Sequence, residues 1–126
     1  MKIVLDTNFI VHAVKHKIDL MEEIAKITQF NAEVCLIDKS IEELEKLIKK
    51  GNLQDRSAAK LGLAIIKRKG LKTINTTENK DVDALLLQLD PKDSIIATHD
   101  KALEKELKEK GFRIIKIRQG KYLKVE

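Results

Sequence analysis

Several residue types that often reinforce a small protein are scarce in this sequence of 126 residues. It has no Trp, one Pro, five Gly and one Cys, and aromatic residues make up 3% of the chain. The single Cys35 excludes an internal disulfide, and the shortage of aromatics predicts an aliphatic core. Because no Pro-rich or low-complexity linker divides the chain, residues 1–126 are expected to form a single domain.

Long apolar runs are also missing. None approaches the roughly 18 residues of a membrane-spanning helix, and the N-terminus lacks a secretory pattern, so we expect a soluble, cytoplasmic protein with no membrane partner. Charged residues, in contrast, make up 36% of the chain, with a net charge of +5. Residues 101–126 hold nine Lys or Arg against four Glu. This basic segment favours an anionic partner such as RNA, although a solvated helix face and edge strand explain it equally well.

Short runs of Val, Ile and Leu alternate with helical patterns along the chain. The predicted strands are 2–6, 34–38, 72–75, 94–99 and 112–118, and the predicted helices include 17–28, 41–50, 55–69, 81–89 and 101–110. Asp55 is a plausible N-cap of helix 55–69, Gly70 ends it, and strand 112–118 alternates like an edge strand. Buried strands that alternate with helices predict an α/β fold, a three-layer αβα sandwich around a mostly parallel sheet of about five strands.

Two acids stand at the ends of predicted strands. Asp6 directly follows the first strand, and Asp100 follows strand 94–99. In parallel sheets, binding sites form at the carboxyl ends of the strands. If these two strands are neighbours, the two carboxylates repel each other unless a cation lies between them. Either acid alone is explained equally well as the N-cap of the helix that follows it.

Further acids stand where helices begin. Glu43 lies in the first turn of helix 41–50, and Asp81 and Asp83 open helix 81–89. Clustered carboxylates without His or Cys suit Mg²⁺ or Mn²⁺ rather than Zn²⁺. Local alternatives exist here as well. Ser40 and Glu43 have the spacing of a capping box, and Asp81 and Asp83 have the positions of an N-cap and a first-turn residue.

Polar and basic neighbours complete the candidate site. Asn8 and Thr98 are expected to hold Asp6 and Asp100 in place, unless they satisfy local backbone groups instead. Candidates for binding RNA phosphates are Lys46, Arg56, Lys60, Arg118 and Lys121, and a solvated surface explains each of them as well. With so few aromatic residues, base stacking is expected to contribute little, and His99 is assigned no role.

Four segments make the sequence resemble the PIN-domain nucleases. They are LDTNFI at 5–10, EEL at 42–44, DALLL at 83–87 and ATHD at 97–100, and they occur in the family's order over nearly the whole chain. The resemblance implies metal-binding catalytic acids at Asp6, Glu43, Asp83 and Asp100, with Asp81 replacing or supplementing Asp83, and Asn8 and Thr98 as supporting residues. It also implies an Mg²⁺- or Mn²⁺-dependent endoribonuclease that cleaves single-stranded RNA by metal-activated water.

Two branches of this superfamily compete. The size of the chain matches VapC-type toxins, which act beside an antitoxin. The segments IIKIRQGKYLKV at 114–125 and EELEKLIKKG at 42–51 resemble instead PIN proteins that process ribosomal RNA in small-subunit assembly. The implied partners are single-stranded or ribosomal RNA, an antitoxin or a ribosome-assembly partner, and a second copy of the chain.

Three other classes are weighed against a nuclease. A HAD-like phosphatase needs a second Asp where this chain has Asn8, and a receiver domain needs an acceptor Asp that segment 72–75 lacks. A catalytically silent RNA-binding scaffold fits the basic C-terminal segment equally well. All four family positions are acidic in this sequence, which favours an enzyme.

Overall fold

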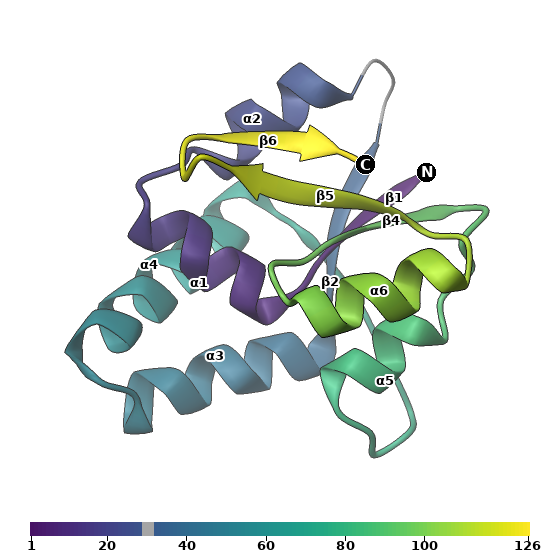
Figure 1. The fold of residues 1–126 in the computed structure, drawn as a ribbon. Helices are drawn as coiled ribbons and strands as arrows, with labels where there is room; N and C mark the ends of the chain where they lie inside the picture. Colours follow the sequence, from purple (N-terminus) through teal and green to yellow (C-terminus); the bar gives the residue numbers. More distant parts are fainter. Residues whose placement is uncertain (29–31) are drawn as a thin grey trace.

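A computed structural model describes residues 1–28 and 32–126 and contains a six-stranded sheet covered by helices (Figure 1). The elements are β1 (Lys2–Leu5), α1 (Thr7–Lys15), α2 (Leu20–Ile27), β2 (Glu33–Ile37), α3 (Asp38–Lys50), α4 (Leu53–Lys69), β3 (Lys72–Ile74), α5 (Val82–Leu87), β4 (Ser94–Ala97), α6 (Lys101–Glu109), β5 (Arg113–Arg118) and β6 (Tyr122–Val125). The strand order is β3-β2-β1-β4-β5-β6, and every neighbouring pair is parallel except β5 and β6.

The sheet has a hydrophobic core on each face. Ile3 and Leu5 of β1 point into one core with residues of α1, α2, α3 and α4, whereas Val4 points into the other with residues of α5 and α6. Successive residues of a strand face opposite sides, so a run of buried Ile, Val and Leu requires helices on both faces. The predicted three-layer sandwich is therefore confirmed. None of the helices in the two described ranges is both long and apolar enough to cross a membrane.

The sheet has one strand more than the five expected. After β5 the chain turns at Gln119 and Gly120, both with positive φ, and β6 returns antiparallel to β5. In Figure 1 this hairpin turns beside α2 and the end of α1. The edge position therefore belongs to β6, and β5 is an inner strand between β4 and β6.

Three helix starts differ from the sequence-based boundaries by two or three residues, and α2 is the first of them, since it begins at Leu20 rather than at residue 17. Asn52 rather than Asp55 caps α4, because the Asn52 side chain accepts a hydrogen bond from the Asp55 backbone amide at 2.8 Å. Gly70 ends α4 in the left-handed conformation, as expected. Helix α3 begins at Asp38, directly after β2 and three residues before the predicted start.

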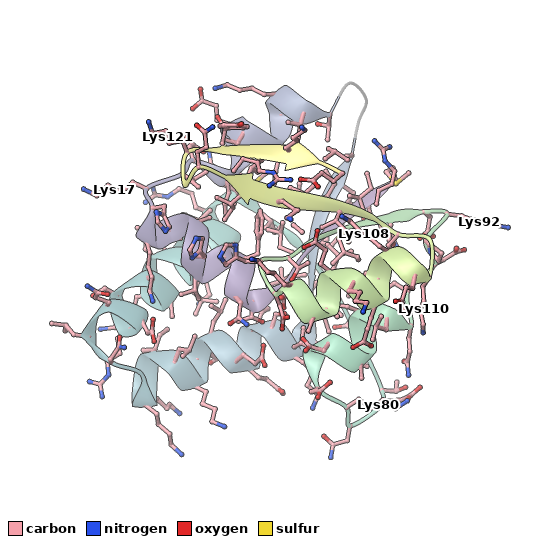
Figure 2. All side chains as sticks on the ribbon, in the orientation of Figure 1. Lys17, Lys80, Lys92, Lys108, Lys110 and Lys121 are labelled. Carbon is pink, nitrogen blue, oxygen red and sulfur yellow. The ribbon has the colours of Figure 1, made fainter. Side chains whose placement is uncertain are left out.

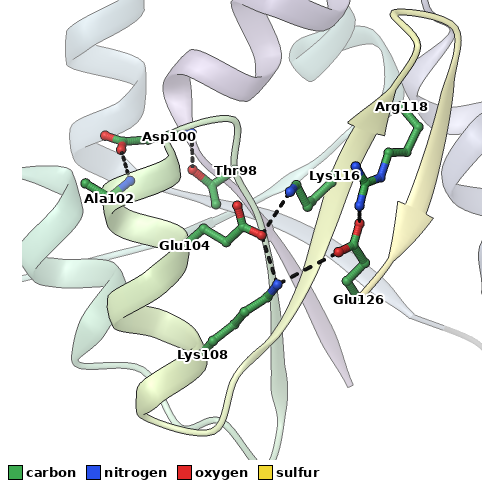
Figure 3. A network of polar contacts seen from close by, with 8 residues as sticks. All are labelled: Thr98, Asp100, Ala102, Glu104, Lys108, Lys116, Arg118 and Glu126. Carbon is green, nitrogen blue, oxygen red and sulfur yellow. Dashed lines mark hydrogen bonds and ion pairs between the residues drawn. The ribbon is translucent and has the colours of Figure 1, made fainter.

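Part of the basic C-terminal segment is neutralised within the fold (Figure 3). The buried carboxylate of Glu104 on α6 pairs with Lys108 at 3.0 Å and with Lys116 at 3.1 Å. Glu126 pairs with Lys108 and with Arg118. Burial alone raises the pKa of Glu104, but the hydrogen bonds from the two lysines outweigh it and leave this pKa below its usual value. These ion pairs join α6 to the β5–β6 hairpin, so the cations they use are not simply a free anion-binding surface.

Candidate functional site

The parallel register brings the ends of β1 and β4 side by side. Leu5 is paired with Ala97, so Asp6 and Thr98 follow at neighbouring positions. The Thr98 hydroxyl donates a hydrogen bond to Asp6 Oδ2 at 3.0 Å, and it accepts one from the Asp100 backbone amide at 3.1 Å. Thr98 therefore contacts both acids that end these strands.

Asp6 is a buried acid with a perturbed pKa. Its side chain is only 3% exposed, and burial raises its pKa to about 6. The hydrogen bond from Thr98 opposes this rise, and the charges of Asp83 and Glu43 add to it. Asp6 occupies the N-cap position of α1, but its side chain makes no capping hydrogen bond, so capping does not explain this carboxylate. A buried carboxylate that faces other acids needs a cation to stay charged at low cost.

Glu43 is not part of a capping box. Because α3 already begins at Asp38, Ser40 lies inside the helix, and within the described ranges its buried hydroxyl has no hydrogen-bond partner. Glu43 Oε1 instead accepts a hydrogen bond from the Thr7 hydroxyl of α1. The sequence interpretation as a capping box is therefore wrong. It also missed Thr7, although Thr7 lies within the segment LDTNFI.

Asp81 and Asp83 have different environments. The Asp81 side chain accepts a hydrogen bond from the Ala84 backbone amide at 2.9 Å and caps α5. The pKa of Asp83 is raised, first by burial and then by the charges of Asp100, Asp81 and Glu43. Asp83 therefore lies within electrostatic range of the other candidate acids, whereas the Asp81 carboxylate is engaged with its own helix.

Asp100 caps α6 and also lies among the candidate acids. Its Oδ1 accepts hydrogen bonds from the backbone amides of Ala102 and Leu103, at 2.9 and 3.1 Å, so the N-cap interpretation is confirmed (Figure 3). Both bonds use the same carboxylate oxygen. In the part of the chain that the structure describes, Oδ2 makes no hydrogen bond, which leaves it available to a ligand.

The donor set suits a hard dication. Asp6, Glu43, Asp83 and Asp100 offer only carboxylate oxygens, the ligands that Mg²⁺ and Mn²⁺ prefer. Among residues 1–28 and 32–126, no three His, Cys, Asp or Glu side chains form a complete metal-binding group. Mg²⁺ usually keeps several waters and binds through one or two carboxylates plus substrate phosphates. An open set of acids on four elements fits that mode of binding, and does not fit a closed cage of protein ligands.

Two clefts share Asn8 and Leu47 as lining residues. One, of about 370 Å³, is lined by Asn8, Val11, His12, Lys15, Leu47, Asp55, His99 and Asp100. The other, of about 310 Å³, is lined by Thr7, Asn8, Glu43, Lys46, Leu47, Lys50 and Gly51. Asn8 is exposed and makes no hydrogen bond with Asp6 in the described ranges, so its predicted contact with that acid is not formed.

The five basic candidates are dispersed. Lys46 lines the cleft beside Glu43, together with Lys50, which the sequence interpretation did not select. Arg56 donates hydrogen bonds to the carbonyls of Gly51 and Lys49 and so closes the turn between α3 and α4.

The other three candidates lie elsewhere. Arg118 pairs with Glu126, Lys60 is exposed on α4, and Lys121 points outward at the hairpin turn (Figure 2). Of the five, only Lys46 lines either of the two clefts that contain candidate acids.

Three histidine rings lie in contact beside Asp100. His12 and His99 stack, with centroids 3.8 Å apart and planes 18° apart, whereas His16 meets His12 at a centroid distance of 4.2 Å with the planes tilted by 48°. His12 lies on α1 and His16 is the C-cap of that helix, whereas His99 follows β4. Alternation along the strand predicts that His99 points away from Asp100, so the sequence assigns it no role, but in the structure both residues line the same cleft.

Comparisons with known proteins agree on one family. The profile of the PIN-like domain family matches residues 3–120. Ribonuclease VapC4 from Methanocaldococcus jannaschii is 34% identical over 125 residues, which are 98% of this chain and 95% of that protein. A solved structure of the PIN domain endonuclease Utp24 has a TM-score of 0.82 and 26% identity, covering 99% of this chain and 90% of that one. A domain of a functionally unknown M. jannaschii protein, 17% identical with a TM-score of 0.62, covers 93% of this chain and 91% of that one and shares the fold.

Proposed function

Because this chain belongs to the PIN-like domain family, we propose that it is an Mg²⁺- or Mn²⁺-dependent endoribonuclease that cleaves single-stranded RNA. The observation that supports this most strongly is the arrangement around Asp6. This buried acid ends β1 and lies within electrostatic range of Glu43 and Asp83, and Thr98 joins it to Asp100. The relatives named a ribonuclease and a PIN domain endonuclease support the same chemistry.

Each side chain has a distinct task in this proposal. When bound, the dication supplies an activated water and neutralises charge that develops on the phosphate. Asp6 and Asp100 offer oxygens from strand ends, Asp83 offers them from the first turn of α5, and Glu43 offers them from within α3, five residues after its start at Asp38. Thr98 orients Asp6 through its hydroxyl.

Residues beside Glu43 orient this side chain and bind the RNA. The Thr7 hydroxyl orients Glu43. Lys46 and Lys50, one helical turn apart on α3, line the cleft beside Glu43 and attract the phosphates of the strand.

Two cellular settings remain for this activity. The resemblance of segment 114–125 to ribosomal-RNA-processing PIN proteins supports a role in small-subunit assembly. The identity with ribonuclease VapC4, which extends over 98% of this chain, supports a toxin that acts beside an antitoxin. Both settings require the same chemistry and differ in the RNA that is cut. The acidic positions are all filled, which favours either of them over a silent RNA-binding scaffold.

Glu43→Gln tests the proposed metal site. The exposed Glu43 side chain does not cap α3, so the variant should fold, and Gln still accepts the hydrogen bond from Thr7. Loss of the charge is expected to lower the rate of Mn²⁺-dependent cleavage of a single-stranded RNA by at least about 100-fold. Cleavage of an end-labelled oligonucleotide, with circular dichroism as the check on folding, measures the effect.

The neighbouring residue provides the matched control. Glu42 is also exposed on α3, and its carboxylate pairs with Lys39 at 3.6 Å rather than facing the acids. Glu42→Gln removes the same charge one position away and should cleave RNA at the wild-type rate. If Glu43→Gln also cleaves at that rate, Glu43 is not a metal ligand and the proposed site is wrong.

A further inference from the structure

The three histidine rings form a row in which His99 stacks on His12 and His16 meets His12 at a tilt, and this row has one closed end and one open end. At the closed end, a Cβ added to Gly120 would lie 3.1 Å from His16 Nδ1, so the backbone of the hairpin turn packs against this ring. His12 is the central ring, because it contacts both of the others. At the other end one face of the His99 ring covers His12, and because His99 is an exposed residue, we take the opposite face as the one that a ligand can reach.

The open end lies next to the candidate acids. His99 directly precedes Asp100, and both line the cleft of about 370 Å³ together with Asn8 and His12. Val11 and Leu47 add apolar surface to the same cleft. Its volume is within the range of pockets that bind small organic groups. A planar group that enters here lies close to both the imidazole of His99 and the carboxylate of Asp100.

The chemistry of this end of the cleft matches an unpaired nucleobase. Single-stranded nucleic acids are held by aromatic side chains on which bases stack, and this mode tolerates any base because every base has a π-face. His12 has a lowered pKa, chiefly through burial and then through the neighbouring rings and Lys15, so the centre of the row stays uncharged near neutral pH.

We propose that the exposed face of His99 is a stacking subsite for one unpaired base of the RNA strand, beside the phosphate that is cleaved at the acids. This inference rests on the proposed function, and it assigns stacking to histidine in a chain with few other aromatic residues. Bracing of the hairpin accounts for His16, which contacts Gly120, but it does not account for the exposed ring of His99. In the described part of the chain, no group that includes His99 has the geometry of a metal site.

The subsite is tested with short single-stranded RNAs that carry 2-aminopurine at successive positions, because the fluorescence of this base falls when it stacks. Titration with the full chain is done in EDTA and in Mg²⁺. We expect the wild-type protein to quench the probe strongly at one position. His99→Ala should abolish that quenching and weaken binding about 5- to 100-fold, whereas His99→Phe, which keeps a planar ring, should retain both.

His16→Ala is the matched control, since it removes the same kind of ring at the closed end of the row. It should leave the quenching and the affinity for RNA within about twofold of wild type, while lowering the thermal stability through loss of contact with the hairpin. In cleavage assays His99→Ala should raise KM more than it lowers kcat.

Three results overturn the inference. They are equal quenching by wild type and His99→Ala, failure of His99→Phe to restore quenching, and a wild-type protein that quenches no position. The proposed function has a separate test. A wild-type protein that stacks the probe base but never cleaves RNA in Mn²⁺ contradicts the nuclease and leaves the stacking subsite standing.

Discussion

Asp6→Asn is expected to stabilise the metal-free protein and to abolish RNA cleavage at the same time. The pKa of Asp6 is about 6 in the folded protein and 3.8 in the unfolded reference, so above this range the charged side chain opposes folding. A difference of about 2 pKa units corresponds to about 3 kcal/mol at most. Asn removes the charge and still accepts the hydrogen bond from Thr98, so we expect a gain of about 1 to 3 kcal/mol near neutral pH.

The pH dependence has a definite sign. Between pH 3.8 and about 6 the folded state binds more protons at Asp6 than the unfolded state, so the stability contributed by this group falls as the pH rises through that window. The gain in free energy of unfolding from Asp6→Asn should therefore be full above about pH 6 and should shrink as the pH falls towards 3.8. Urea unfolding in EDTA at several pH values measures it.

Asp19→Asn is the control for the stability effect. Asp19 is an exposed N-cap of α2 that accepts a hydrogen bond from the Glu22 backbone amide. Asn caps helices about as well as Asp, so this variant should have wild-type stability within about 0.5 kcal/mol and wild-type activity. We propose that the charged Asp6 lowers the stability of the metal-free protein and is needed for catalysis. An Asp6→Asn protein that is less stable than wild type in EDTA, or that still cleaves RNA, contradicts this.

Asp83→Asn and Asp81→Asn are expected to differ sharply. Asp83 lies among the acids, so its loss should lower Mn²⁺-dependent cleavage by at least about 100-fold and weaken Mn²⁺ binding. Asp81 caps α5 through the Ala84 amide, and Asn preserves that bond, so cleavage should stay within about twofold of wild type. Rates at increasing Mn²⁺ concentration separate weaker metal binding from slower chemistry.

The pair of variants is internally controlled, because both make the same substitution within two residues of each other. A reversed pattern, with Asp81→Asn inactive and Asp83→Asn active, would show that Asp81 rather than Asp83 is the metal-binding acid of this segment. In that case the capping bond seen here would have to break when the metal binds. If both variants cleave RNA at the wild-type rate, neither acid of this segment binds the metal.

The strand-end acids could be predicted because their position depends on local patterns. Continuous runs of Ile, Val and Leu mark β1 and β4 as buried parallel strands, and the residue that ends each strand then lies at the edge where sites form. The place of Asp6 and Asp100 follows from those two facts. The same patterns could not identify β6, because the four residues Tyr122–Val125 are too few to distinguish a strand from an extended tail.

The errors at the helix starts have a common cause. A capping box at Ser40 and an N-cap at Asp55 are local patterns, and both ignore where the preceding element ends. Helix α3 starts at Asp38 because β2 ends at Ile37, which places Ser40 inside the helix and frees Glu43 to accept the hydrogen bond from Thr7. That bond joins residues 36 positions apart, so the sequence alone gives no sign of it.

The histidine row shows the same limit. The spacing of four residues between His12 and His16 is visible in the sequence. The third ring belongs to His99, which is distant from both in the sequence. His99 reaches α1 only because β4 lies next to β1 in register. The expectation that base stacking contributes little was drawn from the count of Phe, Tyr and Trp, and it does not take into account imidazole rings that tertiary structure gathers at one cleft.

Crystals soaked in Mn²⁺, with an anomalous difference map, test the central claim most directly. The carboxylates of Asp6, Glu43, Asp83 and Asp100 should then surround at least one anomalous peak, with ordered waters completing its coordination. The opposite result is a map without a peak at this edge of the sheet, with the four side chains turned towards separate surfaces. That outcome would mean that the acids do not form one dication site, and the proposed nuclease chemistry would fail with it.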